Sequence, residues 1–433
     1  MKSLRYIARL TLAFLQRFKT IIIAGILGGV AIFFLSNLLI SAFGHIGSRK
    51  IGIVGRYTVD KLPIEILNMI GNGLTQIDEK GDVSPNLASS WETPDKGITW
   101  IFHLKEGVLW QDEKEVKSAD INYQFSDLQT EKPDAQTLVY KLSDPYSAFP
   151  AVVARPIFKK GLLGTGDWLV KKVALSSANF VQQLTLERGK GEKIIYKFYP
   201  SEERAKLAFK LGEVGELKGL IDAKPFDSWK KVKIEKQPDK GKFVAIFFNT
   251  ENDSVSDKVF RQALAYAIDK DSLEQTRAIS PISENSWAYN PQVKPYNYDA
   301  KKAREQIEGE FEVTLTTSPI LLSVAEKIAK NWQDAGVKTN IQAFSTLPDD
   351  YQALLVIFDI PEDPDQYSIW HSTQTATNIT KYSNPRIDKL LEDGRTEVNL
   401  EERRKIYLDF QRFLVEDSPA IFLYYPTIYT IKR

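Results

Sequence analysis

The longest apolar stretch of the chain runs from Thr20 to Phe43 and contains no charged residue. At about 1.5 Å per residue, a helix of this length can cross a hydrocarbon core about 30 Å thick. Residues 1–19 before it are basic and amphipathic, which by the positive-inside rule predicts a cytoplasmic segment. We therefore expect a single-pass cell-membrane anchor over 20–43 and an extracytoplasmic remainder. Cleavage near Ala42 and Gly44, as in a signal peptide, is the alternative.

Beyond residue 50 the pattern changes to short β-branched runs that alternate with amphipathic stretches, which is typical of a mixed α/β protein. Apolar residues recur at three- and four-residue spacing in three segments, which predicts helices over 256–269, 320–335 and 400–416. Asp417-Ser418-Pro419 should end the last helix, and the β-rich segment Ala420–Ile431 follows.

Length and charge narrow the class of protein. A chain of 433 residues exceeds one ordinary hydrophobic core, so we expect two lobes. The net charge is +1, but residues 1–50 contribute seven cations and no acid, so the remainder carries −6. This balance argues against a nucleic-acid partner. The chain has no cysteine, which excludes disulfides, thiolate metal sites and a lipid-modified cysteine as the anchor.

An ordered set of short motifs extends over about residues 51–426. It comprises Gly73-Leu74-Thr75, Ser84–Trp91, Trp100–Trp110, Gly164-Thr165-Gly166, Phe248-Asn249-Thr250, Asp257–Asp269, Trp287–Pro291, Asp363-Pro364-Asp365 and Tyr382–Pro385. No single motif is specific, but together and in this order they resemble the extracellular solute-binding proteins of family 5, the peptide- and nickel-type binding components of ABC transporters.

The resemblance implies a fold and a function. The fold would be α/β, with the two lobes of a type II, cluster C-like periplasmic binding protein behind the N-terminal transmembrane helix. Lobe one would comprise residues 50–246 and 419–433, lobe two residues 251–418, with chain crossings near Phe247–Thr250 and Pro419–Tyr425. Such a receptor would capture a peptide-like ligand between its lobes and deliver it to the permease subunits of an ABC importer. A membrane-anchored sensor or interaction module on the same fold is the alternative.

The acidic segment 359–365 contains the candidate partners for a ligand ammonium group. The resemblance implies that an aspartate in this loop of lobe two contacts the ligand, and the register leaves Asp359 and Asp363 open, with Asp363 ahead. The alternative is that these acids cap a helix over residues 366–371, because aspartate at a helix start accepts bonds from free N–H groups.

Five further side chains are candidate ligand contacts. Trp287, Trp370 and Tyr367 would form aromatic walls of the cleft, although buried aromatic residues more often belong to a core. Asn378 would offer its amide, or else bond its own backbone. Arg56 would pair with a ligand carboxylate from lobe one, or else form a surface ion pair.

Enzymatic chemistry finds no support in the motifs. The three histidines, His45, His103 and His371, lack metal-ligand spacing, and the chain contains no nucleophile elbow and no phosphate-binding loop. We therefore predict a binding protein that is not an enzyme, without a cofactor or protein-bound metal, whose ligand is a peptide or another small molecule.

Overall fold

The structure is a computed structural model that describes residues 17–19, 48–189 and 191–433. The predicted membrane span over 20–43, and most of the predicted cytoplasmic segment, lie outside these residues. Within the described parts of the chain, none of the helices combines the length and the apolar character that a bilayer crossing requires.

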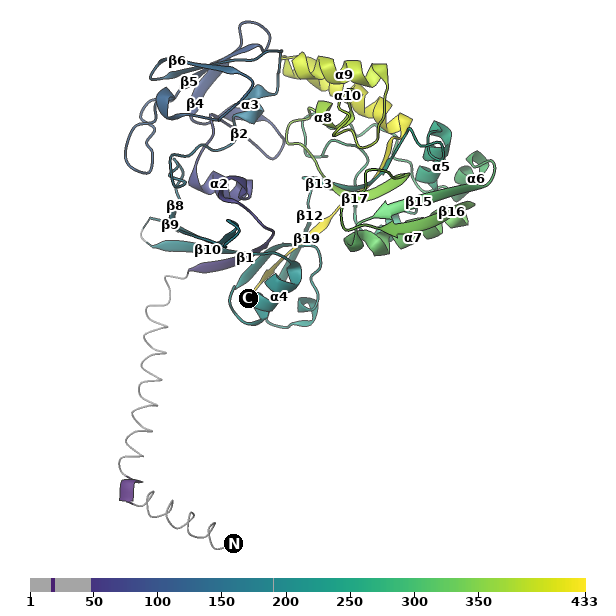
Figure 1. The fold of residues 1–433 in the computed structure, drawn as a ribbon, viewed down its shortest axis with the longest axis horizontal. Coiled ribbons are helices and arrows are strands. Elements are labelled where there is room, and N and C mark those ends of the chain that lie inside the picture. Colours follow the sequence, from purple (N-terminus) through teal and green to yellow (C-terminus); the bar gives the residue numbers. More distant parts are fainter. Residues whose placement is uncertain (1–16, 20–47, 190) are drawn as a thin grey trace.

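A seven-stranded sheet forms the first part of the fold (Figure 1). Its order is β12 (Lys233–Pro238), β19 (Thr427–Lys432), β11 (Glu216–Leu220), β1 (Arg49–Val54), β10 (Glu192–Tyr199), β9 (Val181–Arg188) and β8 (Leu169–Leu175). Side chains alternate between the faces of a strand. Accordingly Ile51 packs in a cluster with helix α2 (Ile64–Ile70), whereas Gly52 faces Leu217 and Val214 beside helix α4 (Glu202–Lys210).

A smaller antiparallel sheet is attached to this first part, in the order β4 (Ala88–Glu92), β5 (Thr99–Leu104), β7 (Thr137–Lys141) and β6 (Gln129–Asp134). Its aromatic core includes Trp100 and Trp110 and packs around the short helix α3 (Phe149–Val152). The hairpin of β2 (Thr75–Ile77) and β3 (Val83–Pro85) completes what we call lobe one.

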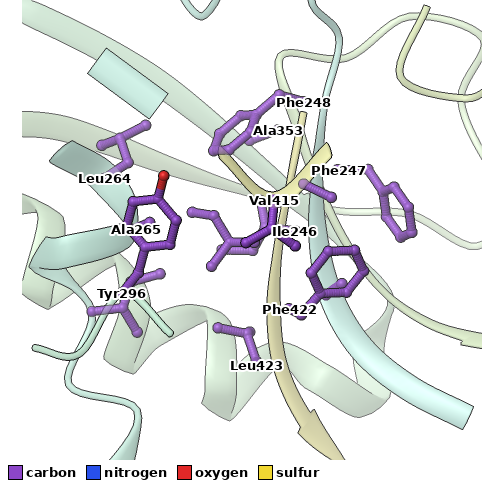
Figure 2. Close-up of a cluster of buried hydrophobic side chains, with 14 of the residues drawn as sticks. Ile246, Phe247, Phe248, Leu264, Ala265, Tyr296, Ala353, Val415, Phe422 and Leu423 are labelled. Carbon is purple, nitrogen blue, oxygen red and sulfur yellow. The ribbon is translucent and has the colours of Figure 1, made fainter. Parts of the chain in front are cut away.

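Lobe two is built on a six-stranded sheet in the order β14 (Thr276–Arg277), β18 (Ala420–Tyr425), β13 (Lys242–Phe248), β17 (Ala353–Asp359), β15 (Phe311–Thr317) and β16 (Val337–Ala343). Strand β13 is apolar and buried along nearly its whole length, as a central strand should be. Figure 2 shows Ile246, Phe247 and Phe248 of this strand within the core.

The helices of lobe two are α5 (Lys258–Ala267), α6 (Ala300–Gln306), α7 (Leu322–Asp334), α8 (Tyr367–Trp370), α9 (Pro385–Thr396) and α10 (Leu400–Asp417). Helices α5, α7 and α10 confirm the three predicted helices. The carboxylate of Asp257 accepts a bond from Phe260 N at the start of α5, and the side chain of Asn399 does the same for α10. Ser418, at a φ of 51°, ends α10 as expected.

The chain crosses between the two larger sheets at residues 239–241 and at Pro426, where Asp239 N donates to Pro426 O at 2.9 Å. The crossings that we expected near Phe247–Thr250 and Pro419–Tyr425 were wrong, because β13 and β18 pair with each other inside the six-stranded sheet. Only β19 returns to lobe one. The sheets therefore assign 242–425 to lobe two, where the sequence had suggested 251–418.

Candidate functional site

A cavity of about 420 Å³ lies where lobe one meets the loop after β17 of lobe two. Helix α2 contributes Ile64 and Asn68 to its wall, and Glu362 is its contribution from lobe two. The other lining residues are Gly71, Asn72, Gln76, Ile77, Asn86, Ala151, Ala154 and Arg155. A concave site between two lobes with a few converging polar groups is the usual form of a small-ligand site.

Glu362 is the carboxylate that lobe two presents to this cavity. Its side chain is only partly exposed to solvent and makes no ion pair with any described residue. It also borders a second interlobe cavity of about 570 Å³, which Glu65 lines from the opposite lobe. Partial burial, and then the Glu65 carboxylate, raises the pKa of Glu362 above its ordinary value. A cationic group in the cleft would stabilise the charged carboxylate and so offset the effect that raises its pKa.

The opposite wall is rich in amide groups and carries one guanidinium. Arg155 is exposed, and its Nη2 donates to Asp60 O at 2.6 Å. Asn72 Nδ2 donates to Thr165 Oγ1 at 2.9 Å, and Asn86 Nδ2 donates to Asn72 Oδ1 at 3.3 Å. These bonds hold the amides in place beside the cavity, where side-chain amides both donate and accept hydrogen bonds.

Close backbone packing positions α2 and the segment after it. A Cβ atom on Gly73 would lie 2.3 Å from Ala154 O, and one on Gly164 would lie 2.1 Å from Ile70 O. Only glycine permits such an approach. Gln111 ties the same region together, because its Nε2 donates to Gly166 O at 2.8 Å and its Oε1 accepts from Gly164 N at 3.1 Å.

Asp363, the favoured candidate of the sequence, is engaged within its own lobe. Its two carboxylate oxygens accept from Arg403 Nη1 at 2.9 Å and Nη2 at 2.6 Å, and the Arg403 side chain is buried. Trp287 packs beside this pair, with its ring centroid 5.6 Å from the Arg403 guanidinium carbon. Asp363 and Trp287 both line a cavity of about 190 Å³ next to the larger one.

The other acids of the segment have separate positions. Asp365 Oδ1 accepts from Tyr367 N at 3.1 Å, so this aspartate bonds the first free N–H of α8, although the N-cap residue itself is Gln366. Asp359 lies at the end of β17 with a largely exposed side chain that pairs with Lys242 on the neighbouring strand. It is not among the residues that line the cavities described here.

Trp370 and Asn378 are core residues. The Trp370 ring is buried against Phe247, and its Nε1 donates to Gln366 Oε1 at 2.8 Å. Asn378 is also buried, and its amide donates to three backbone carbonyls, that of Tyr382 at 2.9 Å among them. Both side chains are buried in lobe two and line none of the cavities described here, so the ligand contact that we expected of them stays a prediction without a place in the site.

Tyr367 lies in a contact between the lobes. The guanidinium carbon of Arg395 lies 4.6 Å from the Tyr367 ring centroid and 4.7 Å from that of Tyr146 in lobe one. Ser147 N donates to Arg395 O at 2.7 Å. The side chains of Tyr146, Tyr367 and Arg395 line a further cavity of about 760 Å³.

Arg56 lies outside these cavities. Its side chain is exposed, and its guanidinium carbon lies 6.0 Å from the Phe180 ring centroid.

The sequence did not mark Glu362, Arg155 or the amides of the cavity wall as candidate ligand contacts. Glu362 lies inside the acidic segment that the motifs singled out, but only the fold shows that its neighbour Asp363 is already neutralised by Arg403. Nothing local marks Arg155 or the amides, because the strand and helix ends that bring them together are distant in sequence. In the described residues, no group of three or more metal-ligating side chains comes together.

The comparisons with known proteins agree with this architecture. The model of the family "Bacterial extracellular solute-binding proteins, family 5 Middle" matches residues 82–130 and 122–378, more than half of the chain. The oligopeptide-binding protein AppA of Bacillus subtilis is 26% identical, over 88% of this chain and 86% of its own length. The dipeptide-binding protein of Escherichia coli is 21% identical, over 81% and 82% respectively.

Solved structures share the fold. NikZ from Campylobacter jejuni in complex with Ni(L-His) superposes with a TM-score of 0.72 at 23% identity, covering 89% of this chain and 94% of that one. Bacillus subtilis AppA with a nonapeptide gives a TM-score of 0.67 at 21% identity over the same shares. These relatives are binding proteins rather than enzymes. The chain belongs to the bacterial extracellular solute-binding proteins of family 5.

Proposed function

We propose that this chain is an extracytoplasmic receptor that captures a peptide-like ligand between its lobes and delivers it to the permease of an ABC importer. The observation that carries the proposal is the interlobe cavity in which Glu362 of lobe two is opposite the amides and Arg155 of lobe one. Relatives named for binding oligopeptides and dipeptides support the class of ligand.

The chemistry of the two walls suits the two ends of a peptide. The free carboxylate of Glu362 would accept hydrogen bonds from a ligand ammonium group, and Arg155 would pair with a ligand carboxylate. The peptide backbone would form hydrogen bonds with the side-chain amides of Asn68, Asn72, Gln76 and Asn86. Because such bonds do not involve the ligand side chains, selection among ligand side chains would be loose. Trp287 and Tyr367 would add aromatic surface from the neighbouring cavities. Arg56 and Asp359 stay predictions without a place in this site.

Hinge rotation about residues 239–241 and Pro426 would open and close the cleft. A ligand that contacts both walls stabilises the closed form only by as much as it prefers that form. The predicted anchor over residues 20–43 is part of the proposal, since it would keep the receptor near its permease and raise the local concentration. The alternative of a membrane-anchored, non-transporting sensor or interaction module is disfavoured, because an interaction module should show a filled cleft and this one holds the unpaired carboxylate of Glu362 and open volume.

Native mass spectrometry of the purified full chain in detergent, followed by release of whatever has co-purified, tests the proposal. We expect peptides that are present in the wild type and depleted in Glu362→Gln, with the occupancy unchanged in the control variant Glu305→Gln, which changes an exposed glutamate of lobe two outside these cavities. A metal chelate, a sugar, or a chain that remains empty when offered a peptide library would contradict peptide capture.

A further inference from the structure

One end of the seven-stranded sheet gathers segments that are far apart in sequence. Arg49 at the start of β1 is opposite Ile194 near the start of β10, and Ile51 is opposite Glu216 at the start of β11. Lys432 near the C-terminus lies opposite Glu216 of β11 on one side and opposite Lys233 of β12 on the other, in the register of the sheet. We call this end the sheet base. It comprises residues 49–50, 207–215, 229–233, 432–433 and the described ends of the β9–β10 turn. Figure 1 shows the C-terminus beside α4 at this base.

The sheet base carries an excess of unpaired positive charge. Its acids are largely neutralised, as Glu216 by Arg49 at 2.9 Å and Glu192 by Arg188 at 2.7 Å. Five exposed lysines make no ion pair with any described residue, and they are Lys50, Lys193, Lys210, Lys230 and Lys231. An accumulation of lysines of this kind attracts anionic surfaces, and each lysine near an anionic membrane contributes to the attraction.

Large apolar side chains are exposed among these lysines. Leu211 is 75% exposed, Leu207 is 51% exposed and Trp229 is 38% exposed. Helix α4 turns Ala205, Ala208 and Phe209 towards the sheet, which leaves Leu207 on its outer face. Trp229 is held edge-on against the buried Phe226, with ring centroids 5.1 Å apart. Protein surfaces that lie in the headgroup region of a bilayer typically combine leucine and tryptophan with surrounding lysines.

The position of the base along the chain identifies the surface that it meets. Only residues 44–48 separate the uncharged run that ends at Phe43 from Arg49, and so short a segment spans at most about 20 Å. Lys50 O accepts from Gly215 N at 3.0 Å, which ties the α4–β11 loop to the same point. If residues 20–43 are in a membrane, Leu211 and its neighbours are within reach of its headgroups.

We propose that the sheet base docks on anionic lipid headgroups of the membrane in which the receptor is anchored, an inference that rests on the proposed anchor. The cleft lies at the opposite ends of the same strands, since Gln237, Pro238 and Ile428 line the 570 Å³ cavity. Docking therefore directs the cleft away from the bilayer and towards incoming ligand.

The test is hydrogen–deuterium exchange of the full chain reconstituted in vesicles of phosphatidylcholine alone or with about one third phosphatidylglycerol. We expect amides of residues 205–215 and 228–233 to exchange several-fold more slowly on the anionic vesicles. The triple variant Leu211→Ser/Lys230→Glu/Lys231→Glu should lose this difference. The control Leu109→Ser/Lys96→Glu/Lys105→Glu changes an exposed leucine and two exposed lysines elsewhere in lobe one and should keep it.

Three results would overturn lipid docking. They are equal exchange on the two lipids, a triple variant that keeps the wild-type difference in exchange, and slowing that appears only when a permease is co-reconstituted. Flotation of the chain with vesicles tests the anchor separately from lipid binding by the sheet base. A chain that does not float with neutral vesicles in high salt refutes the anchor. Lipid binding by the sheet base is then supported if the chain floats in low salt only with anionic vesicles and the triple variant does not, and it is refuted if the chain floats with neither lipid.

Discussion

Adjacent acids in the loop after β17 have different surroundings. Asp363 forms a two-point ion pair with the buried Arg403, while Glu362 has no ionic partner among the described residues and borders two interlobe cavities. A charge that is already neutralised gains little from a ligand, whereas an unpaired carboxylate in a cleft gains much. Under the proposed function, this difference favours Glu362 over Asp363 for ligand capture.

Removal of Asp363 should therefore destabilise the fold. We expect Asp363→Ala to lower the free energy of unfolding by about 3–5 kcal/mol, because the Arg403 guanidinium would stay buried without its counter-ion. Asp359→Ala removes only a surface pair with Lys242 and should cost less than about 1 kcal/mol. Thermal unfolding of both variants, followed by circular dichroism, checks the contrast. Equal losses would refute the assignment.

The affinity for an amine-bearing ligand should depend on pH through Glu362. Its raised pKa means that the carboxylate accepts a proton at a higher pH than an ordinary glutamate. A protonated carboxyl cannot pair with an ammonium group, so affinity is full above this pKa and falls by up to about tenfold per pH unit below it. Calorimetric titration across this range should show a weaker dependence in Glu362→Gln. Parallel profiles would exclude Glu362 as the titrating group.

At the scale of elements, the site depends on how closely α2 and its neighbours pack. Residues 71–73 pass against residues 153–158, and residues 164–166 pass against the end of α2. These contacts place Asn68 and Asn72 on the cavity wall, and they explain physically why glycines recur in the motifs Gly73-Leu74-Thr75 and Gly164-Thr165-Gly166.

Gly164→Ala tests this packing. The added Cβ would lie 2.1 Å from Ile70 O, and a backbone atom cannot move aside without displacing the helix end. We expect a loss of about 1–3 kcal/mol in the free energy of unfolding, together with weaker ligand binding. Gly215→Ala is the control, because its Cβ would meet no atom within 4 Å. A Gly164 variant as stable as this control would disprove the packing argument.

Helices were predictable from the sequence where the apolar pattern was one-sided, as in α5, α7 and α10, and Asp257 and Asn399 also cap two of them. The sheet to which β13 and β18 belong was not predictable, because an apolar run does not reveal its pairing partners. The burial of Trp370 and Asn378 was not predictable for a related reason. Whether a side chain is directed towards a core or a cleft depends on residues distant in sequence.

For the whole molecule, closure depends on contacts that bridge the lobes. The Arg395 guanidinium lies between the rings of Tyr146 and Tyr367, and Trp287 N donates to Lys80 O at 2.9 Å. In the proposed hinge motion, such contacts would stabilise the closed form even without ligand and so reduce the free energy that ligand binding must supply.

Arg395→Ala should shift the ligand-free chain towards the open form. We expect a larger radius of gyration by small-angle scattering and a ligand affinity that is several-fold lower, with little loss of stability. Arg412→Ala is the matched control, since Arg412 also lies over an aromatic ring, that of Phe413, but within one lobe. A radius of gyration that changes equally in both variants, or in neither, would rule out a closing role for Arg395.

In the proposed function, Glu362 captures the amine of a peptide held between the lobes. The most direct measurement is a calorimetric cycle with one peptide in free and N-acetylated form, bound to the wild type and to Glu362→Gln. We predict that acetylation lowers wild-type affinity by at least about tenfold and leaves the affinity of the variant nearly unchanged. An acetylation penalty of the same size in both proteins would show that Glu362 does not bind the ligand amine.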